Sequence, residues 1–545
     1  IRWYPLHSGY HNCISRKQNR SFRRKMVRQR TVRRSDSSNG KVQSNSRESR
    51  DGEGHGGTSG QSLSSSTTAI LVIVTISGWL CAGWMYYSGT PRAVSSSTKR
   101  SFQGDPTLGG WRPADAATLR FLDTTICNID RRSSEELTLD MFESTYRFKK
   151  PVIINFPGGA AGWTDPKRWT LPALKKAYGE WEIVSGRSDD IVRSGGRGDR
   201  PSSFEEYVGL LMNDNQNAEP MYVFDRQFYK YTGLSSTLKV PPYFKIDDSL
   251  EDSIFFMGGS RSGVSFHKHA DAWNAVIYGR KRWFIYLKDT TPPGGIWPGY
   301  STLEWYQHIY PNISQSAKPL ECIQEPGEIL YLPESAYHAT LNIGDTIAFG
   351  IQKKEATTDV EKIFYKILRE VEGFVGNARA PKDKREKAIK KGVEYFETLH
   401  KLMPNSAEVM MKLGDHYNHA GRTDEAIAYT RKAIEVDPYF IVAYLNLAKM
   451  KLNQGLSDEA EELYKKAMQL SPTFWDCYAQ YGDFLTSQSR YNEAVNIFKK
   501  GTEIRPDIVP FWQHLLMAQD AAGDKEGAAA TRRQIEILQS RDAKR

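Results

Sequence analysis

The sequence predicts a multi-domain α+β protein in which one membrane-spanning helix precedes a β-rich domain and an all-α repeat solenoid follows. Three observations predict this order: an uncharged apolar stretch at 69–87, strand-like aromatic and β-branched segments between about 115 and 352, and a 34-residue repeat from Pro404 onward. At 545 residues the chain can hold three or four domains of ordinary size.

Residues 1–68 are rich in Arg, Ser and Gly, without a periodic apolar pattern, as is typical of a disordered arm. The arm holds fourteen Lys or Arg and four Asp or Glu, which matches the net charge of +10 of the whole chain. The rest is therefore charge-balanced, which argues against a globular part that binds nucleic acid. The basic cluster Arg23–Arg34 fits a nuclear signal, a nucleic-acid tail or a juxtamembrane segment. The apolar element that follows favours the juxtamembrane interpretation.

The stretch 69–87 contains no charged residue. As a helix it is roughly 28 Å long, about the thickness of a bilayer's hydrocarbon core. Trp84, Tyr86 and Tyr87 fit an aromatic belt at its end, and a cleaved signal peptide would have a shorter apolar region nearer the terminus. The positive-inside rule then places the arm in the cytosol. We expect a single-pass type II membrane protein of the endoplasmic reticulum with its folded domains in the lumen.

A polar linker at 88–114 leads into the β-rich domain, which we place at 115–352. A short helix at 137–146 feeds a strand at 151–155, and a second short helix covers 202–212. The triplet Asn312-Ile-Ser314 is an N-glycosylation acceptor, and we expect Asn312 to carry a glycan in a lumenal domain. In such an oxidising lumen, Cys127 and Cys322 could form a disulfide.

Three histidines define the candidate site. His267 and His269 are two residues apart, a spacing that places both side chains on one face of a strand. Two strands, Val276–Tyr278 and Trp283–Tyr286, follow and are joined by a turn-like Tyr-Gly-Arg-Lys. Further along the chain, the strand Glu328–Leu332 leads through a turn to His338, about seventy residues after His267. Imidazoles from two such distant segments can converge in a small barrel as a facial three-ligand metal site.

Four stretches carry a resemblance to a known family: Arg147-Phe-Lys-Lys-Pro-Val-Ile-Ile154, His267-x-His269 with Trp273-Asn274 and Gly279-Arg-Lys-Arg-Trp283, Pro326-Gly-Glu-Ile-Leu-Tyr-Leu-Pro333, and His338-Ala-Thr-Leu-Asn342. The region resembles a JmjC domain, the cupin-like double-stranded β-helix of iron(II)- and 2-oxoglutarate-dependent oxygenases. The resemblance implies that His267 and His338 bind iron, that Lys281 binds the far carboxylate of 2-oxoglutarate, and that Asn274 faces this cosubstrate.

Two positions depart from the family pattern. His269 occupies the slot in which the family usually has Asp or Glu, and Val264 the slot in which it often has Thr. A third imidazole leaves iron(II) with a net charge of +2 instead of +1, which changes how oxygen and an anionic cosubstrate bind. Asp271 could supply the missing carboxylate, but only if the chain bulges, since residues four apart on a strand are roughly 13 Å apart.

The C-terminal third is repetitive. Pro404, Pro438, Pro472 and Pro506 are 34 residues apart, and small residues share one slot of each period: Ala426, Ala460, Ala494 and Ala528. Period and pattern resemble the tetratricopeptide repeat, which implies a groove for a protein partner or peptide. We place connecting helices at 353–403 and the repeats at 404–540, with Arg532 in an apolar slot as in a solvent-facing cap.

Two functions are compatible with these features. One is a membrane-anchored lumenal oxygenase that uses Fe(II) and 2-oxoglutarate to hydroxylate a protein side chain, with histone demethylation disfavoured by the anchor. The other is an inactive or weak relative that acts as an interaction scaffold. The identity of residue 269 is the feature that distinguishes them.

Overall fold

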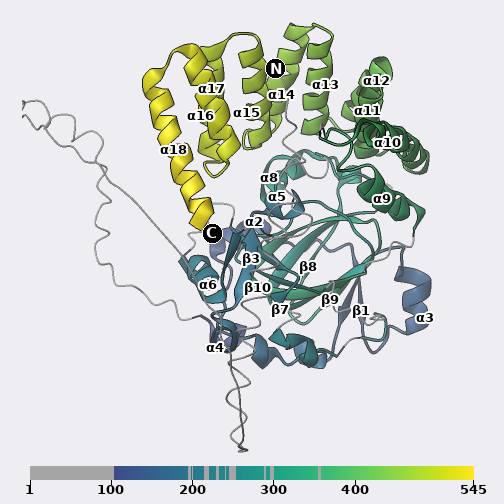
Figure 1. Ribbon diagram of the computed structural model, residues 1–545. Helices are drawn as coiled ribbons and strands as arrows, with labels where there is room; N and C mark the ends of the chain where they lie inside the picture. Colours follow the sequence, from purple (N-terminus) through teal and green to yellow (C-terminus); the bar gives the residue numbers. More distant parts are fainter. Residues whose placement is uncertain are drawn as a thin grey trace, which may run out of the picture. The chain divides into compact units, whose positions relative to one another are not determined.

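The computed structural model describes residues 104–544 except 194–197, 199, 214–219, 229–231, 240, 245–252, 288–289, 295–299, 354–357 and 378. The predicted basic arm (1–68) and membrane-spanning helix (69–87) lie outside the described residues. Among the described helices, none is both long and apolar enough to span a membrane. The predicted order, a β-rich domain followed by helical repeats, is confirmed (Figure 1).

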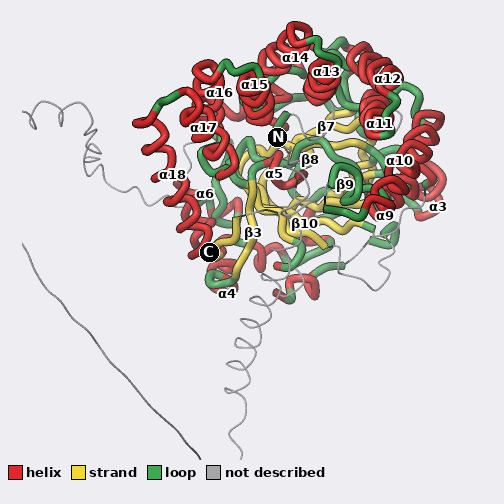
Figure 2. The backbone as a smooth tube through the Cα atoms, turned by 45° about the horizontal axis from the view of Figure 1, so that its top comes forward, coloured by secondary structure: helices red, strands yellow, loops and turns green. Residues whose placement is uncertain are grey.

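The described strands of the first domain form a single sheet in the order β1-β2-β9-β7-β10-β6-β5-β3-β4, with β8 beside β7. The strand bounds are β1 Asp130–Ser133, β2 Val152–Asn155, β3 Glu182–Gly186, β4 Arg200–Ser203, β5 Tyr222–Asp225, β6 Ser253–Gly258, β7 Ala272–Tyr286, β8 Leu320–Gln324, β9 Ile329–Leu332 and β10 Tyr337–Gln352. Figure 2 shows these strands gathered together with helices around them.

The centre of the sheet is the antiparallel pair β7 and β10, in which Ile285 lies opposite His338 and Asn274 opposite Gly350. β9 pairs with the first half of β7 and β8 with the second half, end to end along one edge. The sheet therefore branches at β7. Almost every residue of both central strands is buried, as expected for strands covered on both faces.

The prediction of two strands joined by a turn at Tyr278-Gly-Arg-Lys is wrong, because β7 runs unbroken from Ala272 to Tyr286. Gly279 has φ +72°, and a Cβ there would lie 2.4 Å from the carbonyl oxygen of Asp345. The glycine therefore marks a bulge, where the register with β10 shifts between Ile343 and Ile347, and not a hairpin turn.

The β-rich domain also contains short helices, and the region after it is entirely helical. Those of the β-rich domain are α2 Ala116–Leu122, α3 Leu139–Met141, α4 Leu171–Tyr178, α5 Ser188–Arg193, α6 Phe204–Asn213 and α8 Thr302–His308. The elements expected at 137–146 and 202–212 are present as α3, extended by a π-helical turn at Phe142–Tyr146, and as α6.

The connecting helices are α9 Asp359–Glu370 and α10 Lys382–Leu402, and four helical hairpins follow. The hairpin helices are α11 Ala407–His419, α12 Thr423–Val436, α13 Ile441–Asn453, α14 Ser457–Leu470, α15 Trp475–Ser487, α16 Tyr491–Ile504, α17 Val509–Ala522 and α18 Lys525–Lys544. Figure 1 shows them following one another along an arc from green to yellow. Arg532 is 54% exposed and pairs with Asp520, as expected for a solvent-facing last repeat.

The repeats contact the β-rich domain at a regular interval. The residues just before three of the repeat prolines are buried in these contacts: Asp437 accepts from the Gly294 N–H (2.8 Å), Ser471 donates to Glu304 (2.9 Å) and Arg505 pairs with Asp190 (3.2 Å). One apolar cluster also contains residues of both parts, among them Trp305 and Tyr444. Because the contacts recur with the 34-residue period, one edge of the solenoid is fixed to the domain.

Replacing Arg505 by Met should lower the free energy of unfolding by about 3 kcal/mol, because it removes the buried guanidinium that pairs with the carboxylates of Asp190 and Asp507. Arg505 and Asp190 are 2% and 1% exposed. Urea denaturation of the protein followed by circular dichroism measures the change. Arg532→Met is the matched control, because the Arg532–Asp520 pair is half exposed and contributes less than about 1 kcal/mol. Equal losses for the two variants would contradict the buried contact.

Candidate metal centre

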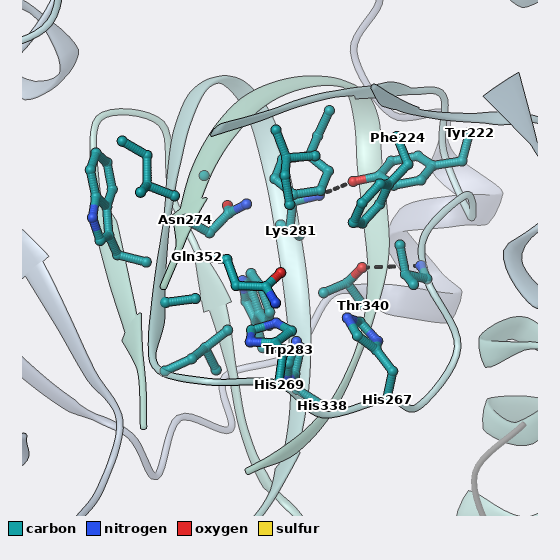
Figure 3. Close-up of a pocket in the computed structure, with 18 residues that line it drawn as sticks. Tyr222, Phe224, His267, His269, Asn274, Lys281, Trp283, His338, Thr340 and Gln352 are labelled. Carbon is teal, nitrogen blue, oxygen red and sulfur yellow. Dashed lines mark hydrogen bonds between the residues drawn. The ribbon is translucent and has the colours of Figure 1, made fainter. Parts of the chain in front are cut away.

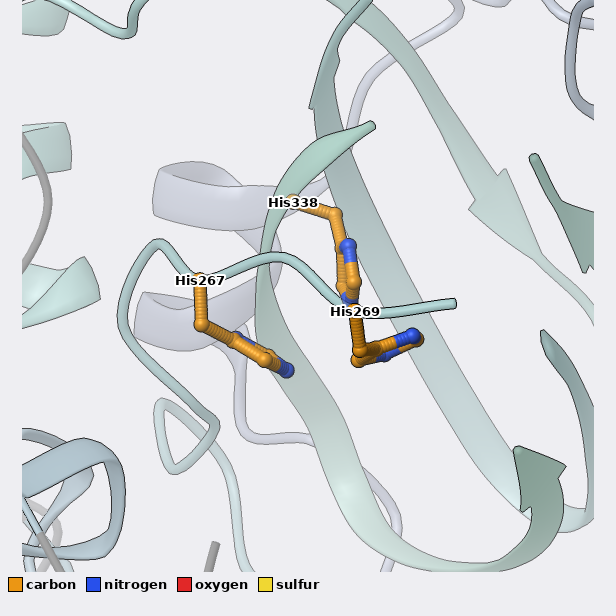
Figure 4. Close-up of side chains that lie close together, drawn as sticks. All are labelled: His267, His269 and His338. Atoms are coloured by element: carbon orange, nitrogen blue, oxygen red, sulfur yellow. The ribbon is translucent and has the colours of Figure 1, made fainter. Parts of the chain in front are cut away.

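Two of the three histidines lie on an extended segment outside the regular strands. His267 forms an isolated antiparallel bridge with His338: its N–H donates to the His338 carbonyl (3.2 Å) and its carbonyl accepts from the His338 N–H (2.9 Å). The carbonyl of His269 accepts from the Ser335 N–H (3.0 Å). The expectation that His267 and His269 share a regular strand is therefore wrong, although the local extended backbone still turns both imidazoles to the same side (Figure 4).

The three imidazoles converge. Ring centroids are 4.3 Å apart for His267 and His338, 4.6 Å for His269 and His338, and 5.5 Å for His267 and His269. One ring nitrogen from each residue lies within 4.8 Å of the others. A metal–nitrogen bond is about 2.1 Å, so side-chain movements of about 1 Å would bring all three nitrogens around one ion.

Backbone carbonyls fix the tautomer of each ring. The Nδ1 atoms of His267, His269 and His338 lie 2.8, 2.6 and 2.9 Å from the carbonyl oxygens of Ser265, Ala270 and Ala336. A carbonyl can only accept, so each Nδ1 carries the proton and each Nε2 presents its lone pair to the common centre. This is the usual way in which proteins orient a metal-binding imidazole.

Burial also keeps the three rings neutral. It is the main reason that the pKa of His267 is lowered to about 4 and that of His269 to about 3, and the His267 imidazole contributes to the lower pKa of His269. The pKa of His338 is lowered well below its ordinary value by burial and then by the other two imidazoles. Neutral imidazole is the metal-binding form, so the cluster is prepared for a divalent transition-metal ion.

The histidines line a cavity that is partly open to solvent, with about 460 Å³ of empty space including the solvent at its mouth, and its walls are largely aromatic and aliphatic. Its lining comes from β5, β6, β7, β9 and β10 and includes Tyr222, Phe224, Phe256, Trp273, Trp283, Leu332, Thr340 and Ile351. Figure 3 shows the histidines toward one side of the view and Lys281 with Asn274 toward the other. The cavity thus joins a candidate metal position to a polar end.

Lys281 lies at that polar end and is 1% exposed. Its ammonium group donates to the Tyr222 hydroxyl (2.9 Å) and the Asn342 side-chain oxygen (3.0 Å), both of which are neutral. Burial lowers the pKa of Lys281 to about 7. A buried ammonium without a carboxylate among these partners is suited to bind an anion that enters the cavity.

Asn274 also faces the cavity, as the resemblance implied. Its side-chain oxygen is buried and has no hydrogen-bond partner among the residues that the structure describes. Buried polar atoms are rarely left unpaired, so this atom is available to a ligand that brings a donor. Both predicted cosubstrate residues therefore lie in one cavity with the three histidines.

Asp271 does not join the cluster. Its carboxylate lies 3.3 Å from the Arg147 guanidinium and 3.5 Å from the Lys353 ammonium, and it is absent from both the metal-type group and the cavity lining. The chain does not bulge to bring it to the histidines, so the structure gives no support to Asp271 as the replacement ligand. Burial raises its pKa, whereas the two cations lower it.

Sequence reasoning missed several cavity residues. Thr340 lines the cavity next to Val264, and its hydroxyl accepts from the Val264 N–H (3.3 Å). A hydroxyl group therefore lies beside position 264, although residue 264 itself carries none. The spacing of two residues from His338 on the same strand was a signal that could have identified it. Tyr222 carried no such signal, because β5 is distant in sequence.

Two peripheral predictions have different outcomes. Cys127 and Cys322 form a disulfide, as predicted, between the approach to β1 and strand β8. Asn312 is exposed at the end of a short 3-10 turn, and its amide donates to the His308 carbonyl (2.8 Å). Exposure is compatible with glycosylation, which stays a prediction.

Comparisons with known proteins identify two regions. A model described as a cupin-like domain matches residues 138–349, and one described as a tetratricopeptide repeat matches 407–440, 441–474 and 476–508. JmjC domain-containing protein 8 of Rattus norvegicus is 33% identical over 254 residues, covering 44% of this chain and 87% of that protein. The expected resemblances to a JmjC domain and to tetratricopeptide repeats are confirmed.

Two more distant relatives cover less of their own length. The bifunctional arginine demethylase and lysyl-hydroxylase psr-1 of Caenorhabditis briggsae is 29% identical over 248 residues, which is 40% of this chain and 60% of that protein. The 2-oxoglutarate and iron-dependent oxygenase JMJD4 of Gallus gallus is 26% identical over 224 residues, which is 35% of this chain and 51% of that protein.

The cluster predicts that the protein binds one Co(II) or Fe(II) ion per chain and that His267→Ala weakens this binding at least about tenfold, since it removes one of three ligands. Equilibrium dialysis with metal analysis under argon gives the stoichiometry and affinity. His419→Ala is the control, because His419 is a partly exposed histidine of α11 paired with Asp415. Identical affinities for the two variants would exclude the three-histidine site.

Proposed function

This chain belongs to the family of JmjC domain-containing proteins, and from that premise we propose that it is an iron(II)- and 2-oxoglutarate-dependent oxygenase that hydroxylates a protein side chain. One observation carries the proposal: three convergent imidazoles and the buried ammonium of Lys281 share a single cavity. A cluster of three histidines that could bind one metal ion would, by itself, fit many functions. Its combination with a buried cation suits a small ligand that is anionic at one end and chelates metal at the other.

The residues of the chain have separable tasks in this proposal. His267, His269 and His338 would hold the metal through Nε2, and that metal, with 2-oxoglutarate and dioxygen, would supply the oxidising power for hydroxylation of a C–H bond. Lys281, with the Tyr222 hydroxyl beside it, binds the far carboxylate by a charge-assisted hydrogen bond. The aromatic walls exclude water and thereby strengthen these polar contacts.

His269 sets the limit of the analogy. With three neutral ligands the bound iron(II) keeps its net charge of +2, which attracts an anionic cosubstrate more strongly than the +1 of a site with one carboxylate. The same change alters the reactivity of the metal toward oxygen. We therefore retain a second candidate, a catalytically weak or inactive domain that serves as an interaction scaffold, because residue 269 is the departure that favours it.

We also propose that the folded domains lie in an oxidising compartment, in a type II protein of the endoplasmic reticulum. The Cys127–Cys322 disulfide supports this location, since structural disulfides persist mainly in such compartments. A lumenal position favours hydroxylation over histone demethylation. The tetratricopeptide repeats support a protein partner or substrate for the surface that is not used against the β-rich domain.

The proposal is tested by anaerobic titration of the purified protein with Fe(II) and then 2-oxoglutarate, followed by measurement of succinate after air is admitted. Stoichiometric iron, saturable 2-oxoglutarate binding and succinate release are expected for an oxygenase. Iron binding without 2-oxoglutarate binding would overturn the cosubstrate assignment. Absence of iron binding would leave the scaffold function.

The affinity for 2-oxoglutarate should fall as pH rises above 7. The pKa of Lys281 is about 7 in the empty cavity, so the protonated form that binds the carboxylate is lost as pH rises through this value. The dissociation constant then increases, by up to about tenfold per pH unit by linkage. Isothermal titration without oxygen at pH 6.5–9 measures it. Lys281→Arg, which stays protonated in this range, should give a much flatter profile; equally flat profiles for both proteins would reject the role of Lys281.

His269→Asp should raise succinate release above that of the wild type, because it restores the carboxylate ligand and the net +1 charge of the usual site. Metal content is measured in parallel, so that a change in turnover is assigned to chemistry and not to loading. His338→Asp is the control, since it removes a histidine that matches the family. A metal-loaded His269→Asp protein without turnover would favour the scaffold.

A further inference from the structure

The side chains that alternate with the metal ligands point away from the metal centre. Lys268 lies between His267 and His269, and Tyr337 directly precedes His338. In extended backbone, successive side chains point to opposite sides, so the ligands face the cavity while Lys268 and Tyr337 face outward. The side of these segments that faces away from the cavity is in contact with the helical region.

Lys268 reaches the helical region. Its ammonium nitrogen lies 3.4 Å from the ring centroid of Phe364, on α9, and donates to the Tyr337 hydroxyl (3.1 Å). It also lies 4.8 Å from the ring centroid of Tyr337. These cation–π and hydrogen-bond contacts fix the residue that links the first two histidines to a helix outside the β-rich domain.

Tyr337 continues this chain of contacts into the first repeat. Its hydroxyl donates to the carboxylate of Glu408, on α11, at 2.7 Å, and both residues are buried. An ammonium, a phenol and a carboxylate are thus joined in series, so the charge of Lys268 is balanced across the phenol by Glu408. One histidine segment and the start of the other are connected to α11 by a single polar path.

A third contact holds the turn between β9 and β10. Ser335 has φ +67°, a left-handed conformation that is unusual for a residue other than glycine. Its N–H donates to the His269 carbonyl (3.0 Å), and its hydroxyl donates to the buried carboxylate of Glu361, on α9 (2.9 Å). A strained turn persists only where its surroundings hold it. Here α9 is the element that does so.

We infer that α9 and α11 position the metal ligands of the three-histidine centre, through an outer network of Lys268, Ser335 and Tyr337 on the β-rich domain and Glu361, Phe364 and Glu408 on the helices. Each of the three histidines is next to one member of this network in sequence or by a backbone hydrogen bond. The inference rests on the proposed function, because it presumes that the histidines bind a metal. The inference goes beyond that function in one respect: the helical region sets the affinity of the three-histidine centre for metal and the arrangement of its ligands.

The network also makes the coupling reciprocal. If α11 holds the ligands in their metal-binding arrangement, then a bound metal must stabilise α11 to the same extent. The repeats would then sense metal loading, and a protein bound to the first repeat that displaces Glu408 would weaken the metal site. Among the other contacts between the two regions, Gly294–Asp437 and Glu304–Ser471 involve no neighbour of a histidine ligand, so they are not expected to have this effect.

Tyr337→Phe tests the inference, because it removes one hydroxyl while keeping the ring. We expect the dissociation constant for Co(II) to rise at least tenfold and the visible absorption of the bound Co(II) to change in shape and intensity. Tyr417→Phe is the matched control: Tyr417 donates to Glu397 (2.8 Å) in a similar Tyr–Glu pair within the helical region, away from the histidines. The thermal stability of each metal-free protein is measured in parallel, and the two variants are compared with the wild type at a temperature at which all three are folded.

The outcomes separate this inference from the proposed function. If the wild type binds no Co(II), the metal site itself is wrong. If the wild type binds Co(II) and Tyr337→Phe has the same affinity and spectrum, the positioning role is wrong. If Tyr337→Phe does not fold, Glu408→Gln, which keeps the size of the side chain and removes its charge, is used with the same expectations.

Hydrogen exchange gives a second readout that a merely structural contact would not change. Co(II) should slow amide exchange in the first turns of α11 and in α9 of the wild type, and this protection should be reduced in Tyr337→Phe. Exchange in α15 serves as the internal reference. Equal exchange of α11 with and without bound Co(II) would overturn the coupling.

Discussion

The antiparallel ladder between β7 and β10 is the constraint on which the rest of this structure depends. It fixes Lys281 opposite Asn342 and Ile285 opposite His338, so the cation and one histidine of the candidate metal centre are held at set positions on adjacent strands. The continuation of β10 toward its N-terminus then bridges to His267 and brings the other two histidines to the third. A cavity with a metal-binding side and a cationic side follows from this register. A slip of one residue would turn His338 to the opposite face.

The helical region belongs to the same physical unit. Its apolar residues share one cluster with those of the β-rich domain, and its polar side chains reach the backbone that holds the histidines. A tethered repeat array would need only a linker, and its removal would leave the site intact. Here the helices contact the outer side of the segments that carry the three histidines. The repeats are therefore part of the structure that holds the histidines in place, in addition to any role in binding a partner.

Much of the site could be predicted from sequence because its residues lie in short local motifs. His267, Lys281, Asn274 and His338 were identified from such motifs, and all four line the cavity. The repeats were equally accessible, since a fixed period is a local property. The Cys127–Cys322 disulfide was predicted without a local motif and is confirmed. Only the approach of β8 to the residues before β1 places Cys322 beside Cys127.

The remainder depended on tertiary contacts. Gly279 suggested a turn because a glycine in a strand pattern fits a turn or a bulge equally well, and only the partner strand distinguishes them. The carboxylate of Asp271 is held by Arg147, more than a hundred residues earlier in the chain, so its distance from the histidines could not be read locally. The path from Lys268 to Glu408 joins residues of two different folds, and no periodicity connects them.

The regular docking of the repeats has a mechanical consequence. In a free solenoid of helical hairpins each repeat contacts only its neighbours, so the curvature of the solenoid can change when a ligand binds along it. This solenoid is held against the β-rich domain at three successive repeat junctions, through Asp437, Ser471 and Arg505, so its curvature is largely set before any ligand binds. Recognition by its outer surface must therefore select ligands that already match its shape, and a ligand that binds gains little by bending it.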